Sequence, residues 1–168
     1  MSETRHPVAM DVVLTVVDPS APEAQWAMAQ YFEELARRLP SGFDPGDALA
    51  EGVRRYRPPT GAFVLAVAGE STAGCGALDL RDDVRAEVKR MWIAPAHRGQ
   101  GLGRRLLSPL EDEARRAGRT TVVLDTNGTL AEAIALYGRA GYVPIERYND
   151  NPYAEHWFAK DLGPVDTG

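Results

Sequence analysis

The stretch from residue 84 to residue 118 most constrains the fold, because a strand, a glycine-rich turn and a helix follow one another in it. Apolar and charged residues alternate up to Lys89, which is typical of a β-strand with one buried face. Lys89 and Arg90 are then both charged, and the next three residues are all apolar. This change of phase indicates either a β-bulge or a strand end that is buried on both faces.

Hydrophobic periodicity predicts a mixture of strands and helices along the rest of the chain. The expected strands cover residues 11–17, 61–68, 72–80, 84–93, 120–125, 142–148 and 155–162, and the expected helices cover residues 22–39, 46–54, 101–117 and 129–140. Because residues 120–125 are almost continuously apolar, that strand suits a parallel or fully covered position. The predicted fold class is therefore α/β, with one mostly antiparallel sheet.

Local signals add detail at the helices. Ser20 with Glu23, and Thr129 with Glu132, have the spacing of a capping box at a helix start. Pro109 lies inside the third expected helix, where a proline removes one backbone hydrogen bond. We therefore expect a kink or a break at that residue.

Composition limits the classes of protein that the chain can belong to. Its 168 residues are 44% hydrophobic and 26% charged, which favours one domain over 1–168, with a loose lead-in (1–10) and a folded core (11–162). The single cysteine, Cys75, excludes an internal disulfide framework, and with three histidines no protein-built metal site is expected. A net charge of −5 argues against a nucleic-acid partner. The sequence has neither a signal-like N-terminus nor an apolar run of about 18 residues, so we expect a cytoplasmic protein without a membrane partner.

The glycine-rich turn has the composition of an anion-binding loop. Gly99, Gly101 and Gly103 alternate directly before and into the expected helix, with Arg98 and Arg104 beside them. Glycines let backbone N–H groups approach a ligand, and the start of a helix adds unsatisfied N–H donors and a positive dipole end. The turn therefore predicts a site for a phosphate or pyrophosphate group.

Two common phosphate-binding loops do not fit the spacing. A Walker A loop is excluded because no Gly-Lys-Ser/Thr follows. The dinucleotide pattern G-x-G-x-x-G fails in both registers, which end on Arg104 or Leu106. Asp125 nevertheless ends the next strand, where a ribose-binding acid is expected, so a nucleotide cofactor stays open as an alternative.

The spacing that fits is R-x-x-G-x-G, and with it the sequence resembles the GCN5-related N-acetyltransferase (GNAT) family. Residues 88–107, VKRMWIAPAHRGQGLGRRLL, resemble the acetyl-CoA motif of that family, and residues 127–145, NGTLAEAIALYGRAGYVPI, resemble its second motif. The resemblance implies an acyl-CoA N-acyltransferase fold, in which a mixed, mostly antiparallel sheet has a splayed parallel strand pair and about four flanking helices.

The resemblance also implies a function. It implies an N-acetyltransferase that moves an acetyl group directly from acetyl-CoA, its co-substrate, to the amine of a small molecule, a peptide or a protein within a ternary complex. A non-catalytic domain of the same fold that binds acyl-CoA is the alternative. The resemblance implies no metal, and homodimers are frequent in the family.

The family motifs map onto particular residues. The strand before the turn would present its backbone to the pantetheine arm, the turn would hold the pyrophosphate, and an Asn after the neighbouring strand would reach the pantetheine. The implied cofactor-binding residues are Met91, Trp92, Ile93, Arg98, Gly99, Gln100, Gly101, Leu102, Gly103, Arg104, Asn127 and Tyr137.

Acyl transfer to an amine needs a base and an acid. A free alkylamine with a pKa of about 10.4 is charged at neutral pH, so it must lose a proton before it attacks. By family position Glu87 is the candidate base, with His156 or water alone as alternatives. Tyr137 matches the family tyrosine that protonates the departing thiolate. Cys75 lies between two glycines in a strand pattern and is expected to be a buried thiol rather than a nucleophile.

Overall fold

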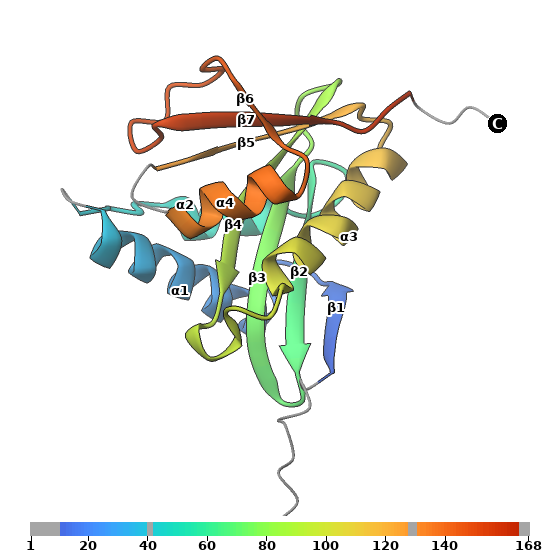
Figure 1. Ribbon diagram of the computed structural model, residues 1–168. Helices are drawn as coiled ribbons and strands as arrows, with labels where there is room; N and C mark the ends of the chain where they lie inside the picture. The colour runs from blue at the N-terminus through green and yellow to red at the C-terminus, as the bar shows by residue number, and fades with distance from the viewer. Residues whose placement is uncertain (1–10, 40–41, 128–130, 165–168) are drawn as a thin grey trace, which may run out of the picture.

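The strands pair into one mixed sheet. The computed structural model describes residues 11–39, 42–127 and 131–164, and within them seven strands run in the order β1-β2-β3-β4-β5-β7-β6 (Figure 1). Their bounds are β1 (Val12–Val16), β2 (Gly61–Ala68), β3 (Ser71–Asp79), β4 (Arg85–Ile93), β5 (Thr121–Thr126), β6 (Val143–Ile145) and β7 (His156–Asp161). All neighbouring pairs are antiparallel except β4 and β5, which are parallel. The predicted α/β class and the mostly antiparallel sheet are confirmed.

Helices cover both faces of the sheet (Figure 1). Their bounds are α1 (Pro22–Arg38), α2 (Ala48–Arg55), α3 (Leu102–Arg116) and α4 (Ala131–Arg139), with a 3-10 turn at Pro95–His97. Side chains of β2 point alternately to the two layers, as its period of two requires. Val64 is buried in the cluster that contains Leu106 of α3, whereas Phe63 is buried in the cluster that contains Met28 of α1. The sheet is therefore the middle layer of three.

The expected cap at Ser20 and the expected break at Pro109 are wrong, whereas a kink at Pro109 stays a prediction. Ser20 does not cap α1, because its hydroxyl hydrogen-bonds Asp18 at 2.5 Å, and the N-cap residue is Ala21, with no side-chain cap bond. Pro109 does not break α3, which continues as one helix through that residue. The packing of α3 against the sheet stabilises the helix enough to offset the one hydrogen bond that a proline removes. The expected capping residue Thr129 lies outside the described residues.

Of the two alternatives for the change of phase in β4, the β-bulge is the one that is present. Gly76 of β3 lies opposite both Arg90 and Met91 of β4, so β4 has one residue more than its partner at this point. Arg90 has a φ of 60°, in the left-handed region that residues with a Cβ rarely adopt. An extra residue bends the strand that contains it and increases the local twist.

The bend separates β4 from β5. The two strands pair only where Arg85–Glu87 meets Thr121–Val123. Beyond Glu87 the backbone of β4 has no strand partner on the β5 side. The splayed parallel pair that the resemblance implies is therefore present.

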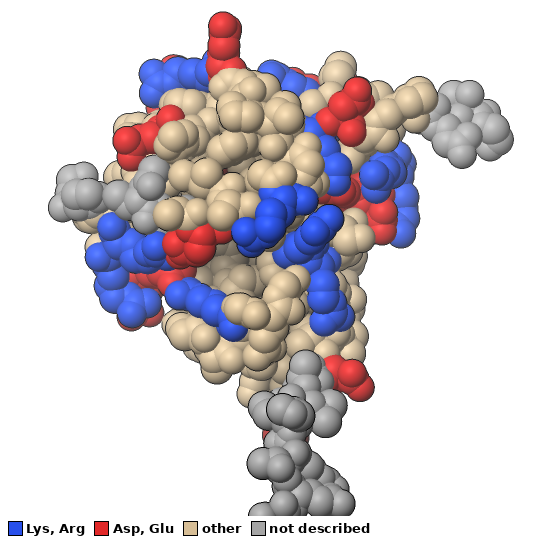
Figure 2. Space-filling model, viewed as in Figure 1, with Lys and Arg blue, Asp and Glu red and all other residues tan. Residues whose placement is uncertain are grey.

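An ion pair joins the two helical layers beside this gap. Arg38 at the end of α1 donates two hydrogen bonds to Glu132 in the first turn of α4, one of them 3.0 Å long from Nη2 to Oε2. In the same view as Figure 1, the surface is hollowed below α4, and acidic and basic side chains gather at the rim (Figure 2). The Arg38 guanidinium holds the pKa of Glu132 at about 2, below its ordinary value of 4.5.

The lowered pKa predicts how this ion pair contributes to stability. A carboxyl whose pKa is lower in the folded state stabilises the fold above its unfolded pKa of about 4.5, and this contribution is lost as the pH falls toward 2. The two side chains are 30% and 59% exposed, so we expect Glu132→Gln to cost at most about 1 kcal/mol at pH 7. Chemical denaturation across this pH range measures the difference. Glu33→Gln, an exposed site on α1, is the control, and an equal loss at pH 7 and pH 2 in Glu132→Gln contradicts the prediction.

Candidate active site

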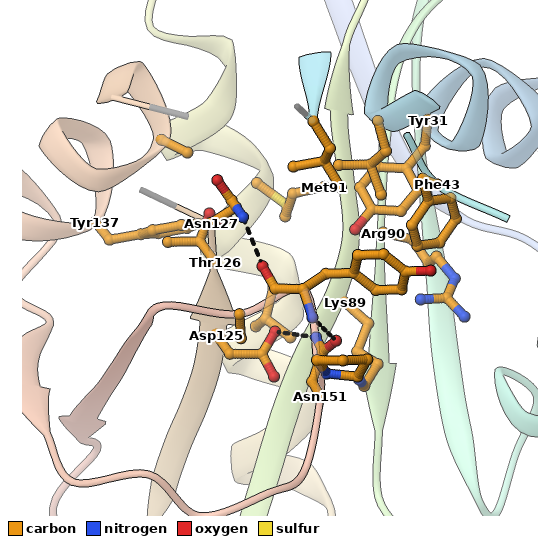
Figure 3. A pocket seen from close by; sticks show the side chains of 17 residues that line it. Tyr31, Phe43, Lys89, Arg90, Met91, Asp125, Thr126, Asn127, Tyr137 and Asn151 are labelled. Carbon is orange, nitrogen blue, oxygen red and sulfur yellow. Dashed lines mark hydrogen bonds between the residues drawn. The ribbon is translucent and has the colours of Figure 1, made fainter. Parts of the chain in front are cut away.

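A cleft opens where β4 and β5 diverge (Figure 3). Its volume is about 290 Å³, and its walls come from β4, β5, α1, α4 and the loop between β6 and β7. Met91 and Asp125 line it from the two diverging strands, Tyr31 from α1 and Tyr137 from α4. Because α1 and α4 pack on opposite faces of the sheet, the cleft passes between the two helical layers.

The glycine-rich turn follows β4 at one end of this cleft. Gly99 and Gly101 have φ values of 78° and 75°, and a Cβ at either position would meet no atom within 4 Å. The six backbone N–H groups from Gly99 to Arg104 donate to no acceptor among the described residues. The N–H of Arg98 does donate, to Pro95 O at 3.4 Å, so the predicted row of open amides begins one residue later. This row is the feature that the sequence analysis expects for an anion site.

The residues of the predicted loop do not all act in the same way. Gly103 is buried in α3, and a Cβ there would lie 2.7 Å from Leu136 of α4, so this glycine allows the two helices to pack closely. Leu102 is 4% exposed and belongs to the core under α3. Gln100 and Arg104 are exposed. The loop therefore offers its backbone to a ligand, while the side chain of Leu102 anchors it.

The guanidinium of Arg98 bonds to other residues of the protein. Its Nε donates to Ile93 O at 2.9 Å, and its Nη2 forms an ion pair with Glu34 of α1. The guanidinium thus fixes the geometry of the turn and the position of α1 next to it. The sequence does not reveal Glu34 as the partner, because 64 residues separate the two side chains.

The predicted pantetheine-facing residues of β4 differ in position. Met91 lines the cleft, on the part of β4 that β5 does not cover. Trp92 is 5% exposed and packs on the α1 side, where its ring meets Trp26 edge-on at 5.7 Å. Ile93 pairs with Gly74 of β3, and its carbonyl oxygen accepts from Arg98.

Tyr137 reaches the cleft from α4. Its side chain is 6% exposed and packs against Tyr142 and Phe158, with ring centres 5.9 and 6.2 Å away. Its hydroxyl has no hydrogen-bond partner among the described residues. Burial raises the pKa of Tyr137 above its ordinary value of 10, so the phenol keeps its proton at neutral pH.

Asp125 is the carboxylate that lines the cleft, which the sequence analysis considers only as a possible ribose-binding acid. It accepts from Asn149 Nδ2 at 2.5 Å and from Asn151 Nδ2 at 3.2 Å, and both asparagines belong to the loop between β6 and β7. Asn127 also lines the cleft, and its Nδ2 donates to Tyr153 O of the same loop at 2.8 Å. Asp125 on β5 and Asn127 directly after it therefore hold this loop over the cleft.

Glu87 does not line this cleft. It borders a separate hollow of about 370 Å³, where its Oε2 accepts from Tyr148 Oη at 2.7 Å and lies 3.6 Å from Lys89 Nζ. The loop between β6 and β7 lies between Glu87 and the cleft, since Asn149 contacts both Glu87 and Asp125. His156 is also outside the cleft lining and stacks near Phe158 at 6.4 Å.

Cys75 is fully buried, as expected. Its Sγ donates to Arg90 O at 3.2 Å, and burial raises the pKa of the thiol.

Among the described residues, no group of three or more His, Cys, Asp or Glu side chains is placed to hold a metal ion. Nor is any helix within the described ranges long and apolar enough to cross a membrane.

Comparison with known proteins decides the family. The model of the Acetyltransferase (GNAT) family matches residues 25–142. The chain belongs to this family. A protein named IAA acetyltransferase, from Azospirillum brasilense, is 35% identical over 132 residues, which cover 76% of this chain and 86% of that protein.

Solved structures of the GNAT family share the fold. A GNAT-family acetyltransferase from Staphylococcus aureus has a TM-score of 0.77 at 15% identity, over 90% of this chain and 100% of that one. A GNAT-family acetyltransferase from Elizabethkingia anophelis with acetyl-CoA bound has a TM-score of 0.63 at 17% identity, over 90% and 98% of the two chains. The predicted family and acyltransferase fold are confirmed, and with them the enzyme class, an acetyltransferase with acetyl-CoA as co-substrate.

The residues of this acetyltransferase fit acetyl-CoA. Six consecutive N–H groups that have no acceptor in the described part of the chain match the several oxygens of a pyrophosphate, and they lie at the positively polarised start of α3. The unpaired edge of β4 beyond Glu87 offers backbone groups to the amides of a pantetheine arm.

Substitution of Gly101 tests the loop. Alanine at a φ of 75° is strained, so we expect Gly101→Ala to lower the free energy of unfolding by about 1–2 kcal/mol. Because relief of the strain turns the neighbouring amides, we also expect the affinity for acetyl-CoA to fall about 10-fold. Gly118→Ala is the matched control, since Gly118 ends the same helix with a φ of 80° and equal space around it. Calorimetric titration with acetyl-CoA measures the affinities, and equal losses of affinity in the two variants contradict the loop's role.

Proposed function

We propose that this GNAT-family protein transfers an acetyl group directly from acetyl-CoA to an amine within a ternary complex. The observation that carries this proposal is the cleft itself, which β4 connects to the row of open amides and which Tyr137 and Asp125 line. Bound acetyl-CoA supplies the acetyl thioester. The protein supplies the binding groups, an acid and a carboxylate, each on a different element.

Asp125 and Tyr137 can divide the proton transfers. The Asp125 carboxylate attracts the ammonium of an acceptor and takes one proton from it, which frees the nitrogen lone pair. As the new C–N bond forms and the C–S bond breaks, Tyr137 donates its hydroxyl proton to the departing sulfur. The second proton of the acylated nitrogen then restores the Tyr137 hydroxyl. The atoms balance as amide, thiol and one proton released to solvent.

The cleft favours direct transfer over an acyl-enzyme. The chain has one cysteine, and Cys75 is fully buried with a raised pKa, so no thiolate is available to attack. Neither a serine nor a histidine lines the described walls of the cleft. A covalent intermediate on the usual Ser-His or Cys-His pair therefore has no support.

Removal of the Tyr137 hydroxyl tests the acid. We expect Tyr137→Phe to lower kcat about 100-fold, because general acids contribute roughly 10²- to 10⁴-fold, while the affinity for acetyl-CoA changes little. Tyr142→Phe is the matched control: it removes the hydroxyl of the neighbouring ring, which is bonded to Glu111 at 2.9 Å and lies outside the cleft lining. Initial rates of thiol release measure both, and similar rates for the two variants argue against Tyr137 as the acid.

A second pair of variants tests the base. We expect Asp125→Asn to raise the KM for the amine and to lower kcat, together reducing kcat/KM about 100-fold. Glu87→Gln is the comparison, because Glu87 is the base that the family position implies. A pH profile of kcat/KM for each variant measures the effect, and a larger loss in Glu87→Gln assigns the base to Glu87 and overturns the assignment to Asp125.

The non-catalytic alternative has a separate readout. A domain that only binds acyl-CoA shows a higher Tm with acetyl-CoA and no thiol release with any amine, whereas an enzyme shows both. A higher Tm with NAD instead supports a nucleotide cofactor. A homodimer and a cytoplasmic location stay predictions of the sequence.

A further inference from the structure

Arg90 lines the cleft, and among the described residues no carboxylate pairs with its guanidinium. Its Cζ lies 4.9 Å from the ring centre of Phe32, 5.6 Å from that of Tyr56 and 5.9 Å from that of Tyr31. No Asp or Glu among the described residues forms an ion pair with it, and its buried Nε has no hydrogen-bond partner among them. Aromatic faces attract a cation, and the hydroxyl of Tyr31 is a hydrogen-bond partner for one N–H group of Arg90, so the other N–H groups remain for a ligand.

The bulge sets the direction of this side chain. Arg90 is the only non-glycine residue with a positive φ in the described part of the chain, and that conformation is unfavourable for a residue with a Cβ. A strained backbone at a cleft indicates that the position has a functional role. Arg90 lies on the α1 side of the cleft, beside Tyr31 and Phe43, and across it from Asp125 and Tyr137 (Figure 3).

Two other basic side chains near the cleft, Lys89 and Arg98, already have acidic partners. Lys89 also lines it, but its Nζ lies 3.6 Å from Glu87 Oε2. Arg98 is paired with Glu34. Arg90 is therefore the cation that remains for a ligand, and Asp125 is the anion at the other side.

Aromatic and aliphatic side chains line the cleft together with polar ones. Tyr31, Leu35 and Phe43 line it, and the ring of Phe43 lies 4.7 Å from that of Tyr153. A volume of about 290 Å³ suits a small molecule rather than a folded protein surface.

We propose that the acceptor is a small amine that also has a carboxylate, namely an α-amino acid with an apolar side chain. Arg90 binds the carboxylate through two parallel N–H···O bonds, Asp125 faces the ammonium, and the aromatic rings contact the side chain. This inference rests on the proposed N-acetyltransferase function and defines its substrate class.

Acceptors that differ only in the carboxylate test the proposal. The pairs are L-phenylalanine with 2-phenylethylamine, L-leucine with 3-methylbutylamine, and L-methionine with 3-(methylthio)propylamine, each with acetyl-CoA and a readout of thiol release. In at least one pair we expect the amino acid to have a kcat/KM about 10- to 100-fold above that of its decarboxylated partner. Equal values in every pair, or a preference for the decarboxylated amines, overturn the proposal.

Variants locate the effect at Arg90. Arg90→Met keeps an unbranched apolar stem against the rings and removes the charge, so KM for the amino acid should rise about 10- to 100-fold while KM for the decarboxylated amine stays nearly constant. Arg90→Lys keeps the charge without the planar fork and should restore part of the affinity. Arg147→Met is the control, because Arg147 lies 5.0 Å over Trp157 and outside the cleft lining. Equal changes of KM for both members of a pair overturn the role of Arg90, and if the Arg90 variants do not fold, the wild-type pairs decide alone.

Failure of this proposal can be told apart from failure of the proposed function. Turnover of plain amines without preference for a carboxylate rejects only the substrate class. Absence of turnover with all six acceptors also rejects the substrate class. The N-acetyltransferase proposal fails only if a wider panel that includes peptides gives no thiol release although acetyl-CoA raises the Tm.

Discussion

The separation of β4 from β5 is the constraint on which the rest of this structure depends. One extra residue in β4, opposite Gly76, bends the strand after three residues of parallel pairing. If β4 and β5 stayed paired along their whole length, no cleft would separate them. The backbone N–H and C=O groups of β4 that now face the cleft would then be bonded to β5. Buried backbone groups need partners, so an unpaired strand edge under two helical layers is favourable only where a ligand can satisfy it.

The same divergence explains why distant segments meet here. Tyr31 and Tyr137 come from helices on opposite faces of the sheet and could not line one cavity if the strands between them were paired. Arg38 and Glu132 join the two helices beside the gap, and Arg98 and Glu34 join α1 to the amide-bearing turn. These ion pairs are partly exposed and contribute little stability each, but they fix α1 relative to α4 and to the glycine-rich turn.

Much of this arrangement can be predicted from the sequence, because it depends on local patterns. The phase change at Lys89 and Arg90 indicates the bulge as one of two alternatives, and the largely apolar run at 120–125 indicates a parallel or fully covered strand, since both are properties of consecutive residues. Side-chain roles that depend on distant partners are not predictable in this way. The pairing of Arg98 with Glu34 and the tight approach of Gly103 to Leu136 require the tertiary structure.

The positions of Glu87 and Asp125 show what the sequence alone does not predict. Glu87 and Asp125 both contact the loop between β6 and β7, and of these two carboxylates the sequence analysis names only Glu87 as a candidate base. Contacts with the loop between β6 and β7 determine which of the two carboxylates lines the cleft. Trp157 Nε1 donates to Asn149 Oδ1 at 2.9 Å, and this bond turns the Asn149 amide so that its N–H groups point to Asp125. Tyr148 meanwhile covers Glu87. The loop between β6 and β7 thus covers Glu87 and holds Asp125 at the cleft, so the base that we propose depends on residues 148–151 rather than on the strand that carries the family motif.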